Sequence, residues 1–189
     1  MIGPKRKVFL LFCPGKGKRM NRIYKAKPRD FLEIAKLDRK AWRENQNSRY
    51  IPDGEHAWRL WVEHALVYCA WNEEKVSGAI LAFPCLSGEF CIHKVFVAPA
   101  LRGKKIGTRL FEKLLQDLDR LGAGSFLTVD PRNESALALY GKWGFTGRMF
   151  VKGFYRKNED RLVLRRAPRK AAEHKARAAK PSSFFLKIG

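Results

Sequence analysis

The most constraining feature of this sequence is a predicted strand that runs through a short basic loop into a long amphipathic helix, within residues 89–121. The strand reads EFCIHKVFV, and the loop that follows contains LRGKK. The helix is expected from about Lys105 to Leu121, because its apolar residues recur at helical spacing and two glycines follow it. A strand and a helix that each have an apolar face bury these faces against one another, so the segment predicts an α/β core.

Shorter strands and helices are predicted before and after this segment. Pro28 and Asp30 open a helix whose apolar residues continue to Trp42. Residues 45–54 read as a loop. Further helices are expected at 55–65 and 134–143, and further strands at 21–27, 66–71, 76–84, 125–129, 145–154 and 161–164. The order β-α-α-β-β-β-α-β-α-β-β predicts one mixed α/β domain with about seven strands and four helices.

The positive charge is concentrated at the two ends of the chain. The formal net charge is +21; residues 1–30 hold ten Lys/Arg against one Asp, and residues 165–189 hold eight against one Glu. We therefore expect a basic appendage at 1–19, a folded domain at 20–166 and a basic, flexible tail at 167–189. Basic ends are typical of contact with RNA or ribosomes. Solvated tails without a partner are the alternative.

Composition and spacing exclude several kinds of protein and site. No apolar run approaches the ~18 residues that a membrane helix needs. The apolar stretch at 8–13 is too short for the core of a signal peptide. The 4 cysteines and 4 histidines show no metal-ligand spacing, so we expect no metal site. This cysteine usage favours a reduced, cytoplasmic environment.

The loop before the long helix has the features of a phosphate site. The first backbone N–H groups of a helix lack internal partners and lie at the positive end of its dipole. Arg102, Lys104 and Lys105 add positive charge, and Gly103 and Gly107 allow close approach to the backbone. It is not a P-loop, because the G-x-x-x-x-G-K-[ST] pattern is absent. Taken alone, these residues leave open a phosphate site or an ordinary basic turn.

A second motif, NESALALYGKWGF, begins at Asn133, which is also the predicted N-cap of its helix. Over roughly 90–165 the chain resembles the GNAT superfamily of acetyl-CoA-dependent N-acetyltransferases. That family has a pyrophosphate loop Arg/Gln-x-x-Gly-x-Gly/Ala and a later Asn-x-x-Ala-x-x-Leu-Tyr-x-x-x-Gly-Phe helix. The resemblance implies a GNAT-like fold and acetyl transfer from acetyl-CoA to a primary amine. One departure is Lys105, which stands where the first loop glycine is usual; its side chain either narrows the cradle or pairs with a phosphate.

The resemblance also implies how acetyl-CoA is held. The pantetheine arm is expected between the strand before the loop and the strand after the long helix, bonded by the backbone of Phe96 and Val97 and by Asn133. Tyr140 is expected beside the thioester sulfur. The loop residues expected to hold the pyrophosphate are Arg102, Gly103, Lys104, Lys105, Gly107 and Thr108.

Tyr140 is the predicted general acid, and the general base is less defined. A leaving thiolate, whose conjugate acid has a pKa of about 8.5, is readily protonated by a nearby phenol of pKa about 10. His93 falls where one polyamine-acetylating branch has Glu, and imidazole has an ordinary pKa of about 6.5, which suits a base. A water relay is the alternative to His93.

The closing stretch VKGFYRKNEDRLVLRR resembles the ribosomal-protein N-terminal alanine acetyltransferase branch. An aromatic pair there helps to form the peptide slot, so Tyr155 is the substrate-side candidate. An α-amino group, with a pKa of about 7.7–8.0, is partly neutral and tolerates a weak base.

Three functions stay open from the sequence. The first is a protein or peptide N-acetyltransferase that acts on an α-amine or a lysine. The second is an acetyltransferase of a small amine or of aminoacyl-tRNA. The third is an inactive fold of this kind that binds RNA or ribosomes. The oligomeric state, monomer or homodimer, is equally open.

Overall fold

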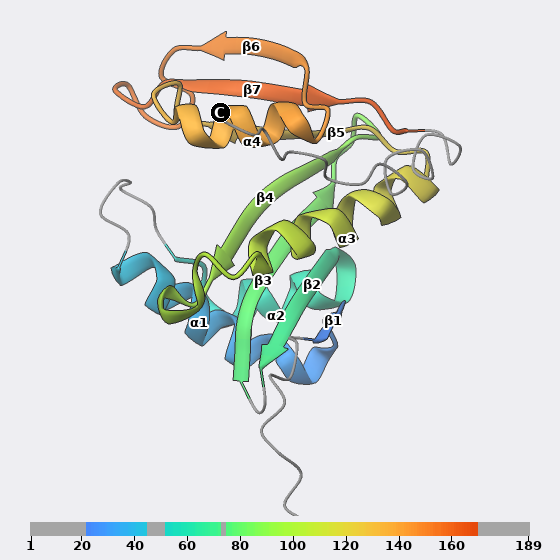
Figure 1. The fold of residues 1–189 in the computed structure, drawn as a ribbon, viewed down its shortest axis with the longest axis vertical. Helices are drawn as coiled ribbons and strands as arrows, with labels where there is room; N and C mark the ends of the chain where they lie inside the picture. Colours follow the sequence, from blue (N-terminus) through green and yellow to red (C-terminus); the bar gives the residue numbers. More distant parts are fainter. Residues whose placement is uncertain (1–21, 45–51, 73–74, 170–189) are drawn as a thin grey trace, which may run out of the picture.

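A single mixed sheet of seven strands, in the order β1-β2-β3-β4-β5-β7-β6, runs through the structure (Figure 1). The computed structural model describes residues 22–44, 52–72 and 75–169. The parallel pair is β4–β5, and the other neighbours are antiparallel. The strands are β1 (Arg22–Lys25), β2 (Leu66–Asn72), β3 (Lys75–Pro84), β4 (Phe90–Val97), β5 (Ser125–Val129), β6 (Gly147–Val151) and β7 (Arg161–Arg166).

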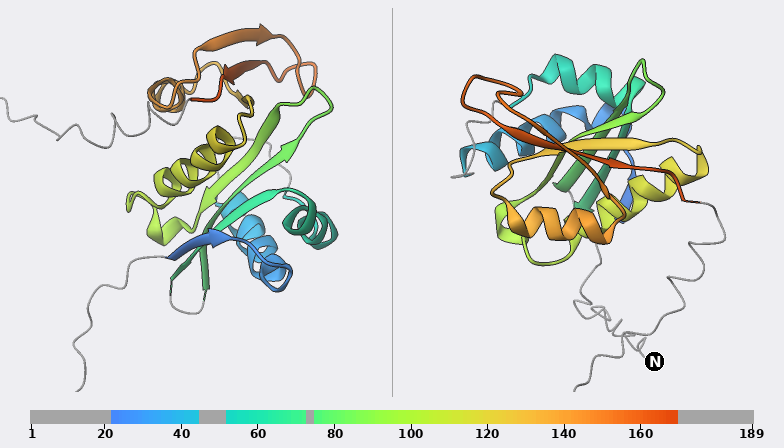
Figure 2. Two further views of the ribbon diagram at one scale, coloured as in Figure 1. Left: turned by 90° about the vertical axis from the view of Figure 1, so that its right-hand side faces the viewer. Right: turned by 90° about the horizontal axis from the view of Figure 1, so that it is seen from above.

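Helices cover the two faces of the sheet and give it two apolar cores. Figure 2 shows α1 and α2 on one face, with α3 and α4 on the other. Trp58 is a fully buried member of the first core, and Leu110 and Phe145 are fully buried in the second. The helices are α1 (Phe31–Arg43), α2 (Glu55–His64), α3 (Ile106–Arg120) and α4 (Glu134–Lys142), and short 3-10 turns, η1 (Pro28–Asp30) and η2 (Pro99–Leu101), precede α1 and α3.

The predicted order of strands and helices is confirmed, and the bounds of the elements differ by a few residues. The largest difference is at β6, which was predicted over 145–154 and extends only from Gly147 to Val151. Phe145 belongs to the turn after α4 and is fully buried in the core. Gly153 has a φ of 62°, which is a turn conformation and not an extended one. The apolar residues of 145–154 therefore predicted one long strand, whereas Phe145 and Gly153 lie in turns outside it.

Strands β4 and β5 separate soon after they begin. They pair only at Phe90 with Ser125 and at Cys91 with Phe126, and they diverge beyond these pairs (Figure 1). On its other edge β4 has a register shift against β3, which leaves His93 as the extra residue. Such a bulge bends a strand and changes the direction of its side chains. The bulge and the short pairing together leave a gap between β4 and β5.

A glycine on β3 brings α3 close to the sheet. A Cβ atom at Gly78 would lie 3.0 Å from the carbonyl oxygen of Phe96 and 3.1 Å from Cδ1 of Leu110. Only a glycine fits this approach without a shift of its neighbours. The first turns of α3 are thereby fixed against β3 and β4, and so is the loop that enters the helix.

The predicted ends of the domain stay predictions. The appendage at 1–19 and residues 170–189 of the tail lie outside the described residues, as does most of the predicted loop at 45–54. None of the described helices is both long and apolar enough to cross a lipid bilayer.

Candidate active site

The loop between β4 and α3 presents the first turn of α3 with its N–H groups free of helical partners. The first helical hydrogen bond runs from the N–H of Arg109 to the carbonyl of Lys105, over 3.0 Å. The N–H groups of Ile106, Gly107 and Thr108 precede it and have no acceptor within the helix. The N-cap residue makes no side-chain cap hydrogen bond, and this turn contains no acidic residue. These features give the turn the charge and the free donors that an anion requires.

A groove of about 350 Å³ begins at this turn and continues along β4 and α4. Seven of the ten residues predicted to bind the donor line it. Its lining consists of Val95, Val97, Leu101, Arg102, Gly103, Lys105, Ile106, Gly107, Thr108, Phe111, Leu139, Tyr140 and Trp143. Val95 was not among the predicted residues, although its place two residues before Val97 is a signal, since alternate residues of a strand share a face.

Three predicted residues do not line the groove. The ring of Phe96 packs on the opposite face of the sheet, where its centroid lies 5.8 Å from that of Trp58. Lys104 is exposed. Asn133 is the N-cap of α4, as predicted, and its Oδ1 accepts a hydrogen bond of 3.1 Å from the N–H of Ala136. The roles proposed for the Phe96 backbone and for Asn133 in holding the pantetheine arm stay predictions.

Lys105 occupies a conformation that favours glycine. Its φ is 57°, and among the described residues it is the one non-glycine residue with a positive φ. This left-handed conformation costs an L-residue roughly 1–2 kcal/mol. It gives a physical reason why a glycine is usual at this position of the loop, and the lysine adds a positive charge at the start of α3.

Replacing Lys105 with glycine is expected to stabilise the fold by about 1 kcal/mol, because the left-handed strain is relieved. The same change is expected to weaken CoA binding several-fold, because one ammonium is lost beside the anion site. Urea unfolding of the free protein and calorimetric titration with CoA measure the two effects. Lys104→Gly is the matched control, since it loses the same charge at a residue without a positive φ. Equal stability of the two variants would contradict the expectation.

Tyr140 reaches the groove from α4 and is enclosed by aromatic rings. Its ring centroid lies 5.6 Å from that of Phe111, 6.3 Å from that of Trp143 and 6.0 Å from that of Phe145. Burial raises the pKa of the Tyr140 phenol above its ordinary value. The phenol therefore keeps its proton throughout the neutral pH range and is available as a proton donor.

His93 lies on the opposite face of β4, between aromatic rings of α2 and β3. The imidazole centroid is 5.7 Å from that of Trp61 and 5.6 Å from that of Phe83. Its Nε2 is 3.8 Å from an oxygen of Asp53, just before α2. We refer to the surface formed by Asp53, Trp61, Phe83 and His93 as the acceptor face. Tyr140 and His93 thus approach β4 from its two sides, and the gap between β4 and β5 lies along this strand.

Tyr155 lies in the connection between β6 and β7 and borders the same gap from the β5 side. Its Oη is 2.8 Å from Oγ1 of Thr128 on β5, within hydrogen-bond distance. The Arg161 guanidinium lies over its ring, 5.1 Å from the centroid. More than half of the Tyr155 side chain is exposed, so it remains open to a ligand.

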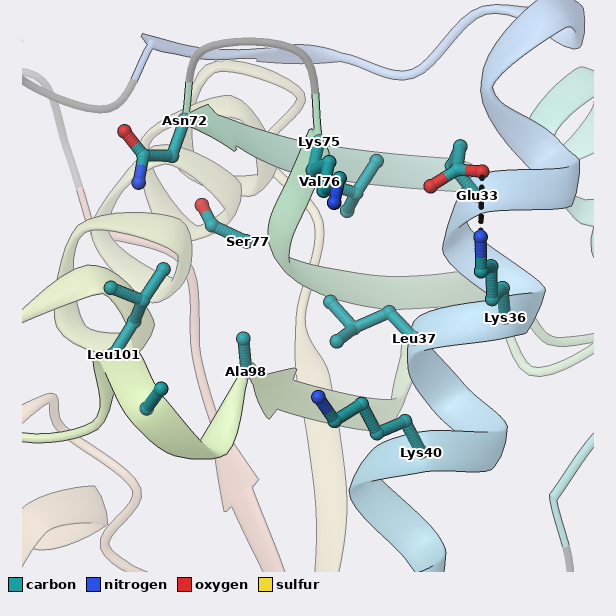
Figure 3. Close-up of a pocket in the computed structure, with 11 residues that line it drawn as sticks. Glu33, Lys36, Leu37, Lys40, Asn72, Lys75, Val76, Ser77, Ala98 and Leu101 are labelled. Carbon is teal, nitrogen blue, oxygen red and sulfur yellow. Dashed lines mark ion pairs between the residues drawn. The ribbon is translucent and has the colours of Figure 1, made fainter.

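A larger cavity, of about 890 Å³, lies between α1 and the ends of β2, β3 and β4 (Figure 3). Its charged lining comes from Lys36 and Lys40 of α1 and from Lys75 of β3, and Glu33 forms an ion pair of 3.6 Å with Lys36. It contains none of the predicted site residues. Most of the predicted donor-binding residues therefore lie at the smaller groove, and none lies at this larger cavity.

Comparison with known proteins points to one family. The family model described as "Acetyltransferase (GNAT) family" matches residues 31–145. A curated relative, an uncharacterized N-acetyltransferase of Methanocaldococcus jannaschii, is 36% identical over 66 residues. These residues make up 34% of this chain and 29% of that protein, so the match spans less than a third of the relative.

Solved structures share the fold at low sequence identity. The ribosomal-protein-S18-alanine N-acetyltransferase of Escherichia coli superposes with a TM-score of 0.67 at 19% identity, over 88% of this chain and 100% of that one. A chain of the NatC complex bound to Gag peptide and CoA superposes with a TM-score of 0.62 at 20% identity, over 79% of this chain and 99% of that one. These similarities confirm the predicted fold.

Proposed function

The chain belongs to the acetyltransferase (GNAT) family, and on that premise we propose that it transfers an acetyl group from acetyl-CoA to a primary amine of a protein or peptide, at an N-terminus or a lysine. The observation that carries this proposal is the position of Tyr140. This half-buried phenol lines a groove that begins at the free N–H groups of α3, as a donor with an anionic tail and a reactive thioester requires.

The residues of the groove fit acetyl-CoA. The first turn of α3, together with Arg102 and Lys105, suits the diphosphate by charge and by its free N–H groups. The side chains of Val95, Val97 and Phe111 suit the thin pantetheine arm. Beyond Cys91 the β5 edge of β4 has no ladder partner among the described residues, so its backbone groups are open to the amides of that arm.

The chemistry is divided between the two sides of β4. When bound, acetyl-CoA supplies a thioester that an amine attacks, with a thiolate as the leaving group. Tyr140 holds a proton at Oη and donates it to the developing negative charge. His93 removes the proton of the amine, or a water molecule beside it relays that proton. His93 is partly exposed on the acceptor face, so it is accessible to an incoming amine.

Two observations support a peptide as the acceptor. The acceptor face is aromatic on one side, and the exposed Tyr155 borders the gap on the other. Among the structural neighbours, one is named a ribosomal-protein-S18-alanine N-acetyltransferase, and another belongs to a complex bound to a peptide. An α-amine, partly neutral at physiological pH, also needs only a weak base.

Turnover of acetyl-CoA with a panel of acceptors tests this function. The panel holds a peptide with a free N-terminus, the same peptide blocked at its N-terminus and carrying one lysine, spermidine, and an aminoacyl-tRNA. We expect the highest kcat/KM with the free or the lysine-bearing peptide. A higher kcat/KM with spermidine or with aminoacyl-tRNA would identify that compound, and not the peptide, as the preferred acceptor. Failure to bind CoA in calorimetry would overturn the proposal as a whole.

A further inference from the structure

A buried lysine connects three elements behind the acceptor face. The side chain of Lys94, on β4, is only 3% exposed, and its Nζ lies 2.8 Å from Oδ2 of Asp38 on α1, whose side chain is 2% exposed. It also contacts Oδ2 of Asp53, in the connection before α2. Asp53 is the member of this cluster nearest to solvent, with 26% of its side chain exposed. Lys94 thus bridges a buried carboxylate and a partly exposed one.

One oxygen of Asp38 joins three parts of the cluster. Its Oδ2 accepts hydrogen bonds from Lys94 Nζ at 2.8 Å, from Trp58 Nε1 at 3.0 Å and from the backbone N–H of Asp53 at 3.1 Å. These donors come from β4, from α2 and from the connection before α2. The backbone and the carboxylate of Asp53 are therefore both fixed by groups that Lys94 and Asp38 supply.

The cluster presents the carboxylate of Asp53 toward the acceptor face. Burial lowers the pKa of Lys94, and its hydrogen bond to Asp38 opposes that effect. The Lys94 side chain contacts two carboxylates, those of Asp38 and Asp53. Asp53 is the carboxylate on the side of His93, and its Oδ2 is 3.8 Å from Nε2 of that residue.

The surroundings of Asp53 suit a cation. The rings of Trp61 and Phe83 flank His93, and aromatic faces attract cations. An amine acceptor arrives largely as an ammonium, with three N–H donors that fit a carboxylate. His93, the base that removes a proton from the ammonium, then lies directly beside Asp53, the carboxylate that binds the ammonium.

We propose that Asp53 binds the ammonium group of the acceptor beside His93, and that Lys94 is the positioning residue that holds Asp53 in place. This inference rests on the proposed function and specifies its acceptor as a cationic primary amine. Asp53 raises the occupancy of the acceptor and takes no part in the donor groove on the other side of β4.

Charge alone and positioning predict opposite effects for Lys94. If Lys94 acted only through its charge, its loss would make the acceptor face more negative, and a cationic acceptor would bind more tightly. If Lys94 positions Asp53, its loss releases the carboxylate and the acceptor binds more weakly. The direction of the change in acceptor KM therefore separates the two roles.

The experiment uses the full chain, acetyl-CoA and the peptide with a free N-terminus. We expect Asp53→Asn to raise the KM for the peptide about tenfold, as for a lost hydrogen bond between charged groups. The kcat and the KM for acetyl-CoA are expected to stay within twofold. Lys94→Met is expected to raise the same KM by a similar factor, and Lys94→Arg to restore it in large part.

Two matched variants control for charge. Glu63→Gln removes one negative charge from an exposed side chain of α2, and Lys113→Met removes one positive charge from α3. Both are expected to leave the KM for the peptide unchanged. Amide hydrogen exchange is a readout independent of activity, because Lys94→Met should speed exchange at the Asp53 N–H, which is bonded to Asp38.

Several outcomes overturn the proposal. An unchanged peptide KM in Asp53→Asn removes Asp53 from acceptor binding, and a lower KM in Lys94→Met removes the positioning role. If Lys94→Met does not fold, Lys94→Gln is measured in its place, and Asp53→Asn still decides the role of the partly exposed carboxylate. A wild-type chain that acetylates none of the amines overturns the proposed function and this inference together. Normal acetylation by the wild-type chain, with an unchanged peptide KM in Asp53→Asn and Lys94→Met, overturns this inference alone.

Discussion

Replacing Tyr140 with phenylalanine is expected to lower kcat by about 10²–10⁴-fold, the range for loss of a positioned general acid. The change removes one hydroxyl and keeps the ring, whose contacts with Phe111, Trp143 and Phe145 hold α4 in place. The fold and the affinity for CoA should therefore change little. A large loss of kcat with normal CoA binding would identify the phenol as the group that acts on the leaving thiolate.

Steady-state kinetics with acetyl-CoA and the peptide, together with calorimetry for CoA, check this result. Tyr155→Phe is the matched control, because it removes a hydroxyl that lies in hydrogen-bond distance of Thr128 and outside the donor groove. Its effect should fall on the KM for the acceptor. A Tyr140→Phe variant with wild-type kcat would exclude the general-acid role and leave Tyr140 as a packing residue.

The pH dependence follows from the direction of the pKa shift. Burial raises the pKa of Tyr140 above its ordinary value of about 10, so the proton-bearing form persists to higher pH than in a free tyrosine. The protonated phenol is fully present below the ordinary pKa of tyrosine, and it is lost only as the pH rises through the raised pKa of Tyr140. Loss of the acid should therefore not limit kcat between pH 6 and 9 (roughly the range of such assays).

Replacing Asp119 with alanine is expected to destabilise the fold by about 3–5 kcal/mol, since it leaves a buried guanidinium without its counter-ion. Asp119 lies in the last turn of α3 and accepts two hydrogen bonds of 2.7 Å from Arg166 on β7. The two side chains are 2% and 1% exposed. Arg166 also donates to the carbonyl of Trp143, and the N–H of Arg169 donates to Asp119. The pair therefore joins α3, the end of α4 and β7.

Urea unfolding followed by circular dichroism measures this loss, with Glu112→Ala as the control on an exposed position of the same helix. The control should change the free energy of unfolding by less than about 0.5 kcal/mol. The double variant Asp119→Leu/Arg166→Met removes both charges and should recover much of the stability. A loss in Asp119→Ala no larger than that in the control would show that the pair contributes little.

The fold was predictable because its main signals are local. The apolar stripe of 105–121 and the glycines after it predicted α3, and the two motifs predicted the elements that flank the donor groove. The bounds of β6 were not predictable, because Phe145 is apolar both in an extended strand and in a buried turn. Apolar character predicts that a residue is buried, but it does not predict the backbone conformation in which the residue is buried.

The acceptor face was much less predictable than the donor groove. In a regular strand His93 and Lys94 point to opposite faces, yet both reach Asp53 because the bulge lies at His93. Lysine in a strand reads as a surface residue, and the burial of Lys94 depends on a carboxylate 56 residues earlier. Neither the bulge nor this long-range pair has a signal in the local sequence. The left-handed conformation of Lys105 differs in this respect, because the loop motif has a glycine at this position, whereas the lysine itself does not favour that conformation.

Strand β4 separates the donor groove from the acceptor face. Val95 and Val97 line the groove on the side of α3, whereas His93 faces the rings of Trp61 and Phe83 on the side of α2. On the proposed function, acetyl-CoA and its acceptor therefore approach β4 from opposite sides. An acceptor as bulky as a folded protein would then cover the side of α2 and leave the side of α3 open for CoA to depart.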